Sequence, residues 1–309
     1  MTEAVNKLEK LRALLKSYGS CLVAYSGGVD SVFLAHVAHG VLGDHALAAI
    51  ADSPSLPRRE LQEALDLAAK FAFPVRVLQT REFANDNYTA NPANRCYFCK
   101  HELFEELTPL ARRENFAVIA YGENASDIGD FRPGAQAAAE FQVRAPLKEI
   151  GLTKAEIREL SAQLDLPTAD KPQMACLSSR VPYGEPVTAA KLLMIERAEY
   201  VLRDLGFRNV RVRHHEMGNN GGEALKHANV PTGAAAHNSA NQRPDVATSL
   251  ARIELAPAEI PALLANGKLA AVAEELKRIG YVHVTLDLQG YRRGSTNEVL
   301  GEKPKEAQA

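Results

Sequence analysis

The segment Ser26-Gly27-Gly28-Val29-Asp30-Ser31 has the composition of a phosphate-binding loop. It follows a short apolar run and precedes a helical pattern, so glycines allow a tight turn while backbone N–H groups and a helix N-terminus face one point. The hydroxyls of Ser26 and Ser31 can donate further bonds, and Asp30 can help to hold Mg²⁺ against a polyphosphate. The alternative is a plain glycine turn capped by serine. The residues expected to bind phosphate are Ser26, Gly27, Gly28, Asp30 and Ser31.

This loop differs from two better-known phosphate motifs. It lacks the Gly-Lys-Ser/Thr ending of a Walker A loop, and it is not a Gly-x-Gly-x-x-Gly dinucleotide fingerprint. It resembles the Ser-Gly-Gly-x-Asp-Ser loop of the PP-loop ATP pyrophosphatases, the superfamily of GMP synthetase and the tRNA-thiolating enzymes. That resemblance implies cleavage of ATP to AMP and pyrophosphate, with adenylation of a substrate oxygen. The spacing alone does not show which phosphate bond breaks.

Polar residues also follow two other predicted strands. Because ligands bind beyond the carboxyl ends of parallel strands, these residues should line the same rim as the loop. Asp52 and Ser53 could reach the adenosine, and Gly122 and Asn124 are further candidates for ATP binding. Asn124, Asp127 and Asp130 could bind metal or orient substrate. The alternative is a surface loop rich in helix caps.

The chain has four cysteines, Cys21, Cys96, Cys99 and Cys176, too few for a disulfide scaffold in 309 residues. We expect reduced thiols, with Cys21 a small buried hydrophobe in an apolar run. Cys96 and Cys99 lie three residues apart just before a predicted helix, a spacing that lets both sulfurs point at one metal ion or cluster. A redox pair, half a zinc site or a coincidence in a helix cap are the alternatives.

Cys176 lies in a polar, cationic stretch with Ser178, Ser179 and Arg180, a setting that favours thiolate. If this stretch folds over the open edge of the sheet, Cys176 reaches the rim that presents the phosphate loop. Cys96 and Cys99 could reach it too. Three thiolates around one point are the ligands of a [4Fe-4S] cluster in which one iron has no protein ligand. They match such a cluster better than a zinc site, which would be closed by four ligands.

The first half of the chain alternates short β-type runs with helical periodicity. The predicted strands are 21–25, 46–51, 75–78, 117–121 and 141–147. The predicted helices are 31–41, 58–71, 100–113 and 153–164. Such alternation indicates an α/β fold with a doubly wound, mostly parallel sheet and helices on both faces. We assign this domain to residues 1–168.

A loop-like stretch rich in Pro, Ser and Gly, residues 169–186, forms the predicted domain junction and carries Cys176. Residues 187–309 are expected to form a smaller α+β domain. Its predicted helices are 189–205 and 268–279, and its predicted strands are 209–214, 251–255 and 282–288. Residues 216–249 lack periodicity and are expected to be a mobile insertion.

Composition argues against several classes of protein without excluding a nucleic-acid partner. The net charge of −2 provides no excess positive charge for wrapping a nucleic acid. No window approaches the ~20 apolar residues that a membrane-spanning helix needs, and the N-terminus reads as a charged amphipathic helix rather than a signal peptide. We therefore expect a cytoplasmic protein without a nucleic-acid or membrane partner.

The whole pattern resembles the LarE family, the ATP-dependent sulfur transferases of nickel-pincer nucleotide biosynthesis. The matching segments, which lie in both predicted domains, are 26–31, 94–100, 122–133, 171–184, 210–215, 251–255 and 290–298. The phosphate loop alone indicates only the PP-loop superfamily. The junction with Cys176 and the Arg-Val-Arg strand are the features that resemble the LarE family in particular. The insertion departs from the pattern, since a short turn would be expected there.

The resemblance implies two-step chemistry on pyridinium-3,5-biscarboxylic acid mononucleotide. A carboxylate attacks the α-phosphorus of ATP, and sulfur then displaces AMP to leave a thiocarboxylate. In one branch of the family Cys176 donates its sulfur and becomes dehydroalanine. In the other, Cys96, Cys99 and Cys176 hold a [4Fe-4S] cluster carrying an extra sulfide, and we favour this branch. It implies a sulfur donor, and we also expect a homo-oligomer.

The second domain offers cations for phosphate. In 210–213, strict alternation buries both valines and sends Arg211 and Arg213 to one face, where guanidiniums can clamp phosphate bidentately. Further candidates for the substrate phosphate are Arg180, Arg252, Arg292 and Arg293. Solvated arginines on an exposed face are the alternative. His214 and His215 read as a solvated pair, and Glu196 and Glu199 could face a metal or merely water.

Two other functions remain open. A tRNA-thiolating or GMP-synthetase-like enzyme would adenylate a different oxygen, and thiolation of tRNA would require a basic face spanning many phosphates. A non-catalytic nucleotide sensor, with cysteines on zinc, would bind ATP without releasing pyrophosphate.

Overall fold

In the computed structural model of this protein, residues 2–129, 132–172, 175–217, 249–265, 267–292 and 294–301 are described. They form two compact units. Unit 1 comprises Met1–Leu177 and Pro186–Ala189, and unit 2 comprises Ser178–Glu185 and Ala190–Ala309.

The core of unit 1 is a parallel four-stranded sheet. Its strands are β1 (Cys21–Tyr25), β2 (Ala46–Asp52), β3 (Val75–Gln79) and β4 (Val118–Tyr121), in the order β3-β2-β1-β4. The chain steps outward from β1 to β3 and then returns to the other side of β1. The strand order therefore reverses between β1 and β4, the position where open α/β sheets bind ligands.

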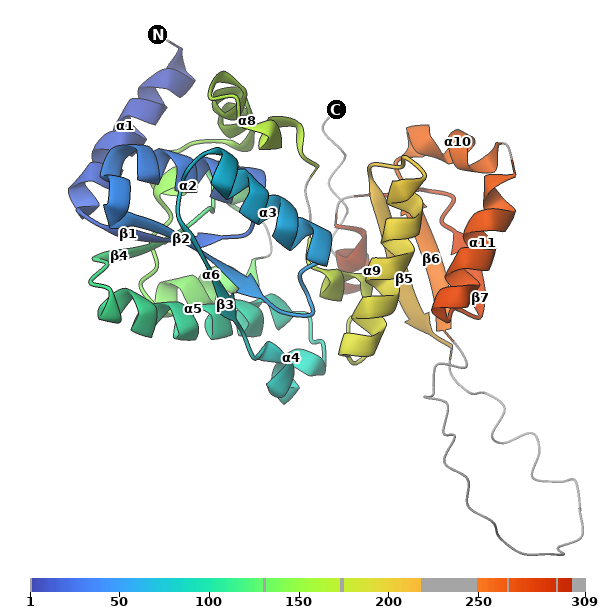
Figure 1. Ribbon diagram of the computed structural model, residues 1–309. Coiled ribbons are helices and arrows are strands. Elements are labelled where there is room, and N and C mark those ends of the chain that lie inside the picture. Colours follow the sequence, from blue (N-terminus) through green and yellow to red (C-terminus); the bar gives the residue numbers. More distant parts are fainter. Residues whose placement is uncertain are drawn as a thin grey trace, which may run out of the picture. The chain divides into compact units, whose positions relative to one another are not determined.

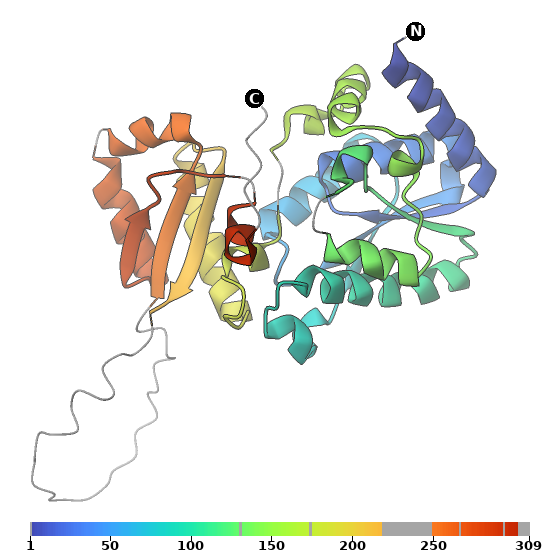
Figure 2. The same cartoon turned by 180° about the vertical axis from the view of Figure 1, so that it is seen from behind.

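Helices cover both faces of this sheet, so the predicted doubly wound α/β fold is confirmed (Figures 1 and 2). The helices on one face are α1 (Glu3–Tyr18), α2 (Val29–Leu42), α3 (Arg58–Lys70) and α8 (Lys154–Gln163), and those on the other are α5 (Arg95–Arg113) and α6 (Pro133–Glu140). Alternation along β1 explains the two layers. Val23 packs with the first group, whereas Leu22 and Ala24 pack with the second.

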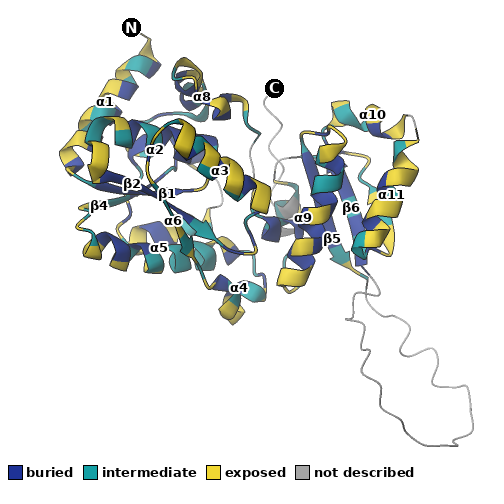
Figure 3. Ribbon diagram, viewed as in Figure 1, coloured by how far each residue is buried: buried dark blue, intermediate teal, exposed yellow. Residues whose placement is uncertain are grey.

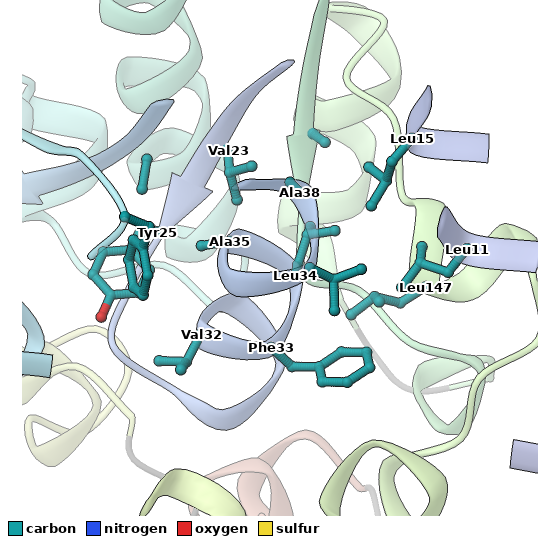
Figure 4. Packing of buried hydrophobic residues seen from close by; sticks show 14 of the residues in the cluster. Leu11, Leu15, Val23, Tyr25, Val32, Phe33, Leu34, Ala35, Ala38 and Leu147 are labelled. Carbon is teal, nitrogen blue, oxygen red and sulfur yellow. The ribbon is translucent and has the colours of Figure 1, made fainter. Parts of the chain in front are cut away.

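The helix that follows the phosphate loop is anchored by the larger of the two cores. Val32, Phe33 and Leu34 of α2 are each fully buried. They pack in one cluster with Val23 of β1 and Leu147 (Figure 4). Burying a large apolar side chain contributes roughly 1.5–3 kcal/mol, so the first turns of α2 are held firmly behind the loop.

Two sequence predictions about unit 1 are wrong. Residues 141–147 do not form a strand, because α6 ends at Glu140 and the short helix α7 (Pro146–Glu149) begins soon after. The only strand-like contact of these residues is an isolated parallel bridge between Arg144 and Ala120 of β4. The cysteine pair does not precede a helix, since α5 begins at Arg95 and contains both thiols in its first two turns.

Unit 2 is an α+β structure with a three-stranded sheet of order β5-β6-β7. Its strands are β5 (Val210–Glu216), β6 (Ser249–Leu255) and β7 (His283–Leu286), of which β5 and β6 are antiparallel and β6 and β7 parallel. Its helices are α9 (Ala189–Asp204), α10 (Ile260–Leu264) and α11 (Lys268–Ile279). Most of the predicted insertion, residues 218–248, lies outside the described residues.

Burial follows the sheets in both units. The strands β1, β2, β5 and β6 are largely buried, while one side of each outer helix is exposed (Figure 3). None of the helices in the described ranges combines the length and the apolar character needed to cross a membrane.

Candidate functional site

The phosphate loop joins the end of β1 to the start of α2, and its first and last residues contact each other. The backbone N–H of Ser26 donates to Oγ of Ser31 at 3.1 Å, and the two serine hydroxyl oxygens are 3.1 Å apart. Gly27 has a φ of +70°, and a Cβ there would lie 2.8 Å from Cβ of Ala64 on α3. Both the backbone conformation and the close approach therefore require glycine.

The start of α2 is open to an anion. Gly28 is its N-cap residue and has no side chain that could accept a bond from the first N–H groups. Those groups have no acceptor within the helix, and the fourteen-residue helix directs the positive end of its dipole toward the loop. This arrangement is compatible with the phosphate site predicted from the sequence.

Gly122, which directly follows β4, packs against the same loop. A Cβ at position 122 would lie 3.0 Å from the backbone nitrogen of Ser31 and 3.1 Å from Cβ of Asp30. The residues after β1 and β4 therefore meet at the point where the strand order reverses, as the sequence predicted for this rim.

Asp30 is the carboxylate of the loop, and its two oxygens have different surroundings. Oδ2 accepts a hydrogen bond from Nζ of Lys154 at 2.7 Å. Oδ1 is buried and lacks a hydrogen-bond partner within the described part of the chain. A buried carboxylate oxygen beside a phosphate loop fits the needs of Mg²⁺, which takes one or two carboxylates and completes its shell with phosphate and water.

The polar residues after β4 are used as caps. Oδ1 of Asn124 accepts from the N–H of Ser126 at 2.9 Å, and Oδ2 of Asp127 accepts from the N–H of Asn124 at 3.1 Å. Arg132 pairs with the other oxygen of Asp127. Burial raises the pKa of Asp127, although Arg132 opposes this effect. Asp130 lies outside the described residues.

The residues after β2 are also engaged with neighbouring groups. Asp52 accepts bonds from Arg58 and from Nε2 of Gln79, the latter at 2.9 Å. Ser53 is buried, and its hydroxyl accepts from the N–H of Ser55 at 3.2 Å. Ser53 thus shapes the rim beyond β2, and its contact with adenosine stays a prediction.

The three candidate thiols of unit 1 lie in one neighbourhood. The backbone N–H of Leu177 donates to the carbonyl of Ser55 at 2.9 Å, which ties the segment carrying Cys176 to the chain just beyond β2. The pKa of Cys96 and that of Cys99 are both raised, first by desolvation of the sulfur atoms and next by the negative charge of a Cys176 thiolate, although the Cys96 residue as a whole is exposed. Cys176 therefore interacts electrostatically with both thiols, and a shared site for the three sulfur atoms stays a prediction.

These thiols do not form a ready metal site. Across the described ranges, no group of three His, Cys, Asp or Glu side chains is arranged to hold a metal ion. The four cysteines form no disulfide. The raised pKa of Cys96 and that of Cys99 disfavour the thiolate forms, so a metal would have to displace the protons of both thiols.

Unit 2 carries the arginines expected to bind the substrate phosphate. Val210 and Val212 of β5 pack in the core, so Arg211 and Arg213 share the opposite face, as predicted. Both arginines are buried rather than solvated. Arg213 forms a two-point ion pair with Glu254 at 2.8 and 3.0 Å. The Arg211 guanidinium lies 4.8 Å from the ring centre of Tyr291.

Burial and the neighbouring charge of Arg180 lower the pKa of Arg211 to about 10. Arg180 itself is fully buried and pairs with Glu199 at 2.8 Å. Burial disfavours the Glu199 carboxylate, but Arg180, Arg211 and Arg203 together outweigh burial, and the pKa of Glu199 is lowered. Glu199 is buried and does not face water, which corrects that alternative, and among the described residues it belongs to no group of three side chains that could hold a metal ion.

The remaining candidates of unit 2 have diverse surroundings. Arg252 pairs with Glu254 at 3.1 Å, and Arg292 pairs with Glu298. Arg293 lies outside the described residues. His214 is buried, so the prediction of a solvated histidine pair is wrong for it. Glu196 accepts a bond from the Tyr200 hydroxyl at 2.7 Å.

Sequence reasoning missed three lysines beside the site. Lys154 reaches Asp30, and Nζ of Lys171 lies 3.0 Å from Glu60 and 3.5 Å from the carbonyl oxygen of Gly27. The ammonium of Lys100 lies over the ring of Tyr121, and burial lowers its pKa. Lys154 and Lys171 approach the loop through long-range folding, for which their local sequence has no signal.

The chain is similar in sequence to several known proteins. No model of a protein family matches the chain. An uncharacterised protein of Synechocystis sp. is 42% identical over 295 residues, 96% of this chain and 98% of that protein. The pyridinium-3,5-bisthiocarboxylic acid mononucleotide synthase of Lactiplantibacillus plantarum is 30% identical over 301 residues, 97% of each chain. An uncharacterised protein of Methanocaldococcus jannaschii is 28% identical over 69% of this chain and 82% of its own.

Proposed function

This chain belongs to the family of the pyridinium-3,5-bisthiocarboxylic acid mononucleotide synthase, and on that premise we propose that it is an ATP-dependent sulfur transferase of nickel-pincer nucleotide biosynthesis. Its substrate is pyridinium-3,5-biscarboxylic acid mononucleotide, and it converts a carboxylate of that molecule into a thiocarboxylate. The observation that carries the proposal is the similarity to that synthase over 97% of both chains, and the electrostatic interaction of Cys176 with Cys96 and Cys99, in the unit that also contains residues 26–31, supports it.

The first step activates the carboxylate. A carboxylate oxygen of the substrate attacks the α-phosphorus of ATP, and the bond to pyrophosphate breaks. The loop N–H groups and the hydroxyls of Ser26 and Ser31 hold the phosphates, while Asp30 holds Mg²⁺ through its buried oxygen. Gly122, Asn124 and Ser53 shape the rim on which the nucleotide rests.

In the second step, sulfur attacks the carbonyl carbon of the acyl adenylate and AMP leaves with the electron pair of the broken C–O bond. Adenylation is required because a free carboxylate has no good leaving group. A thiolate or sulfide is nucleophilic near neutral pH without further activation.

We assign the sulfur to a [4Fe-4S] cluster held by Cys96, Cys99 and Cys176. What supports such a cluster is the number of candidate ligands, three thiols, and the electrostatic interaction of Cys176 with the other two. When bound, the cluster supplies a sulfide on the iron that has no protein ligand. The chain supplies thiolates, with Arg95 and Lys100 opposing the raised pKa of Cys96.

A second route is favoured by the absence of a metal-binding group among the described residues. Here Sγ of Cys176 attacks the acyl adenylate and displaces AMP. Removal of the α-proton of Cys176 then expels the thiocarboxylate by breaking the Cβ–Sγ bond, which leaves dehydroalanine in the chain. This route consumes one protein molecule for each sulfur transferred.

Unit 2 supplies charge for the phosphate of the substrate nucleotide. Arg211 is the strongest candidate because burial beside Arg180 destabilises its charge, and a bound phosphate would compensate for that cost. Arg213, Arg180 and Arg252 add positive charge to the same sheet and its flanking segment, although Glu254 and Glu199 neutralise part of it.

The test begins with protein prepared without oxygen. We expect brown protein with about four iron and four sulfide per chain, and release of pyrophosphate only when ATP and the pyridinium substrate are both present. Cys176→Ala should retain pyrophosphate release and form no thiocarboxylate. Colourless protein that completes one turnover and loses sulfur at Cys176 establishes the second route. ATP binding without pyrophosphate release contradicts the proposed function and indicates a nucleotide sensor.

A further inference from the structure

The phosphate loop contains no lysine or arginine of its own. A polyphosphate with its metal still carries net negative charge, and positive groups directed at it strengthen binding in a partly buried site. The cation that reaches the loop carboxylate is Lys154, whose Nζ lies 2.7 Å from Oδ2 of Asp30 although 124 residues separate the two in sequence.

The position of Lys154 is set by two elements. It is the first residue of α8, whose N-cap Thr153 forms a reciprocal capping box with Glu156. Its backbone N–H donates to Oγ of Ser126 at 3.0 Å. Ser126 belongs to the short helix after β4, in which the N–H of Ala125 donates to the carbonyl of Leu152 at 2.8 Å. These bonds hold the start of α8 at the carboxyl end of β4, next to β1, where the strand order reverses.

The side chain of Lys154 is partly exposed to solvent. It is 30% exposed, whereas that of Asp30 is 18% exposed. While Lys154 occupies Oδ2, the carboxylate can offer a metal only Oδ1, which is buried and has no partner within the described residues. The ammonium and a divalent cation therefore compete for one carboxylate.

We propose that Lys154 is a nucleotide-binding residue that pairs with Asp30 in the free protein and transfers its ammonium to the polyphosphate when Mg²⁺ and ATP bind. The inference rests on the proposed function in requiring ATP at this loop. It adds an exchange of partners: the metal replaces the ammonium at Asp30, and phosphate replaces the carboxylate at Lys154.

Lys171 is a weaker candidate for this role. Its ammonium is held by two carboxylates, Glu60 at 3.0 Å and Glu63 at 3.2 Å, so its surroundings are already net negative. Arg158 donates to the carbonyl of Lys171 at 2.8 Å, which fixes the backbone there. These contacts assign Lys171 to fastening the segment that leads to Cys176.

The test compares Lys154→Met with Lys7→Met. Lys7 is a matched control, because its ammonium also lies 2.7 Å from a carboxylate of unit 1, that of Glu156, and contacts Oε1, whereas the bonds to Thr153 that cap α8 use Oε2. We measure the Kd of ATP in the presence of Mg²⁺ by calorimetry, and the Kd of Mn²⁺ without nucleotide by electron paramagnetic resonance.

Lys154→Met should weaken ATP binding by about tenfold to hundredfold, the loss expected for one charge-assisted hydrogen bond. It should tighten Mn²⁺ binding without nucleotide, because the competing ammonium is gone, and Lys7→Met should change neither constant. This opposite sign separates partner exchange from damage to the fold, which weakens both. Lys154→Gln provides the same comparison if the methionine variant does not fold.

Three outcomes overturn the inference while leaving ATP binding by the unmodified protein intact. They are an ATP Kd within twofold of that protein, an unchanged Mn²⁺ Kd, and an equal loss of ATP affinity in Lys7→Met. Failure of the unmodified protein to bind ATP contradicts the proposed function instead, and it is detected before any variant is compared.

Discussion

At the scale of residues, unit 2 is distinguished by charges that lie in its interior. Arg180 and Glu199 are both buried and form an ion pair, and Arg213 and Glu254 form another. Removing one partner of a buried pair costs about 3–5 kcal/mol, because the remaining charge has no compensation. Any test of these arginines in phosphate binding must therefore measure folding alongside activity.

His214 makes the stability of unit 2 depend on pH. Burial lowers the pKa of His214 to about 4, an effect that Lys191 and His215 strengthen and Glu216 opposes. Between pH 6.5 and 4 the unfolded chain binds more protons than the folded one, so stability falls as the pH falls. At pH 5 the free energy of unfolding is lower by roughly 2 kcal/mol than at neutral pH because of His214.

We expect hydrogen exchange of β5 and β6 amides to show less protection at pH 5 than at pH 7, after correction for intrinsic rates. His214→Gln should reduce this difference. His283→Gln, which changes an exposed histidine of the same sheet, should leave it intact. An equal pH effect in the unmodified protein and in His214→Gln would assign the dependence to other groups.

At the scale of elements, the approach of β4 to the phosphate loop is set by the small size of Gly122. We predict that Gly122→Ala weakens ATP binding by about tenfold or more, because its Cβ would press on Ser31 and Asp30 at 3.0–3.1 Å and displace the start of α2. Calorimetry with ATP and Mg²⁺ measures the effect.

Gly40→Ala is the control for this prediction. Gly40 lies within the same helix, and an added Cβ there meets no atom within 4 Å. Its helix should become more stable by up to about 1 kcal/mol, with ATP affinity unchanged. If Gly122→Ala and Gly40→Ala bind ATP equally, the contact between β4 and the loop does not control the site.

At the scale of the whole molecule, the protein consists of two units with separate hydrophobic cores. A ligand stabilises the part of a protein that holds it, by about 2.7 kcal/mol at a hundredfold excess over Kd. We expect ATP with Mg²⁺ to slow hydrogen exchange in β1 and α2 of unit 1 while exchange in β6 of unit 2 stays unchanged. Equal slowing in both units would show that nucleotide binding couples them.

The sequence by itself determined the elements that depend on local signals. The helices α1, α2, α3, α5, α8, α9 and α11 and the seven strands were predicted near their observed positions, because apolar periodicity and turn residues act over a few neighbours. The position of residues 26–31 between a strand and a helix was predicted for the same reason, and their binding of phosphate stays a prediction.

Local signals failed where the surroundings decide the outcome. Residues 141–147 are apolar enough for a strand, but Phe141 caps the end of α6 and Pro146 begins α7, so only the bridge from Arg144 to Ala120 forms. The short helices α4 (Asp86–Thr89), α6 and α10 carried too little periodicity to be predicted.

Only the tertiary structure decided which charges meet. It brought Lys154 to Asp30, placed the thiol of Cys176 within electrostatic reach of Cys96 and Cys99, and buried Arg211 beside Arg180. These groups are far apart in sequence, and their interactions depend on distances and on the local dielectric. Distance and burial are properties of the packed chain, and residue order does not reveal them.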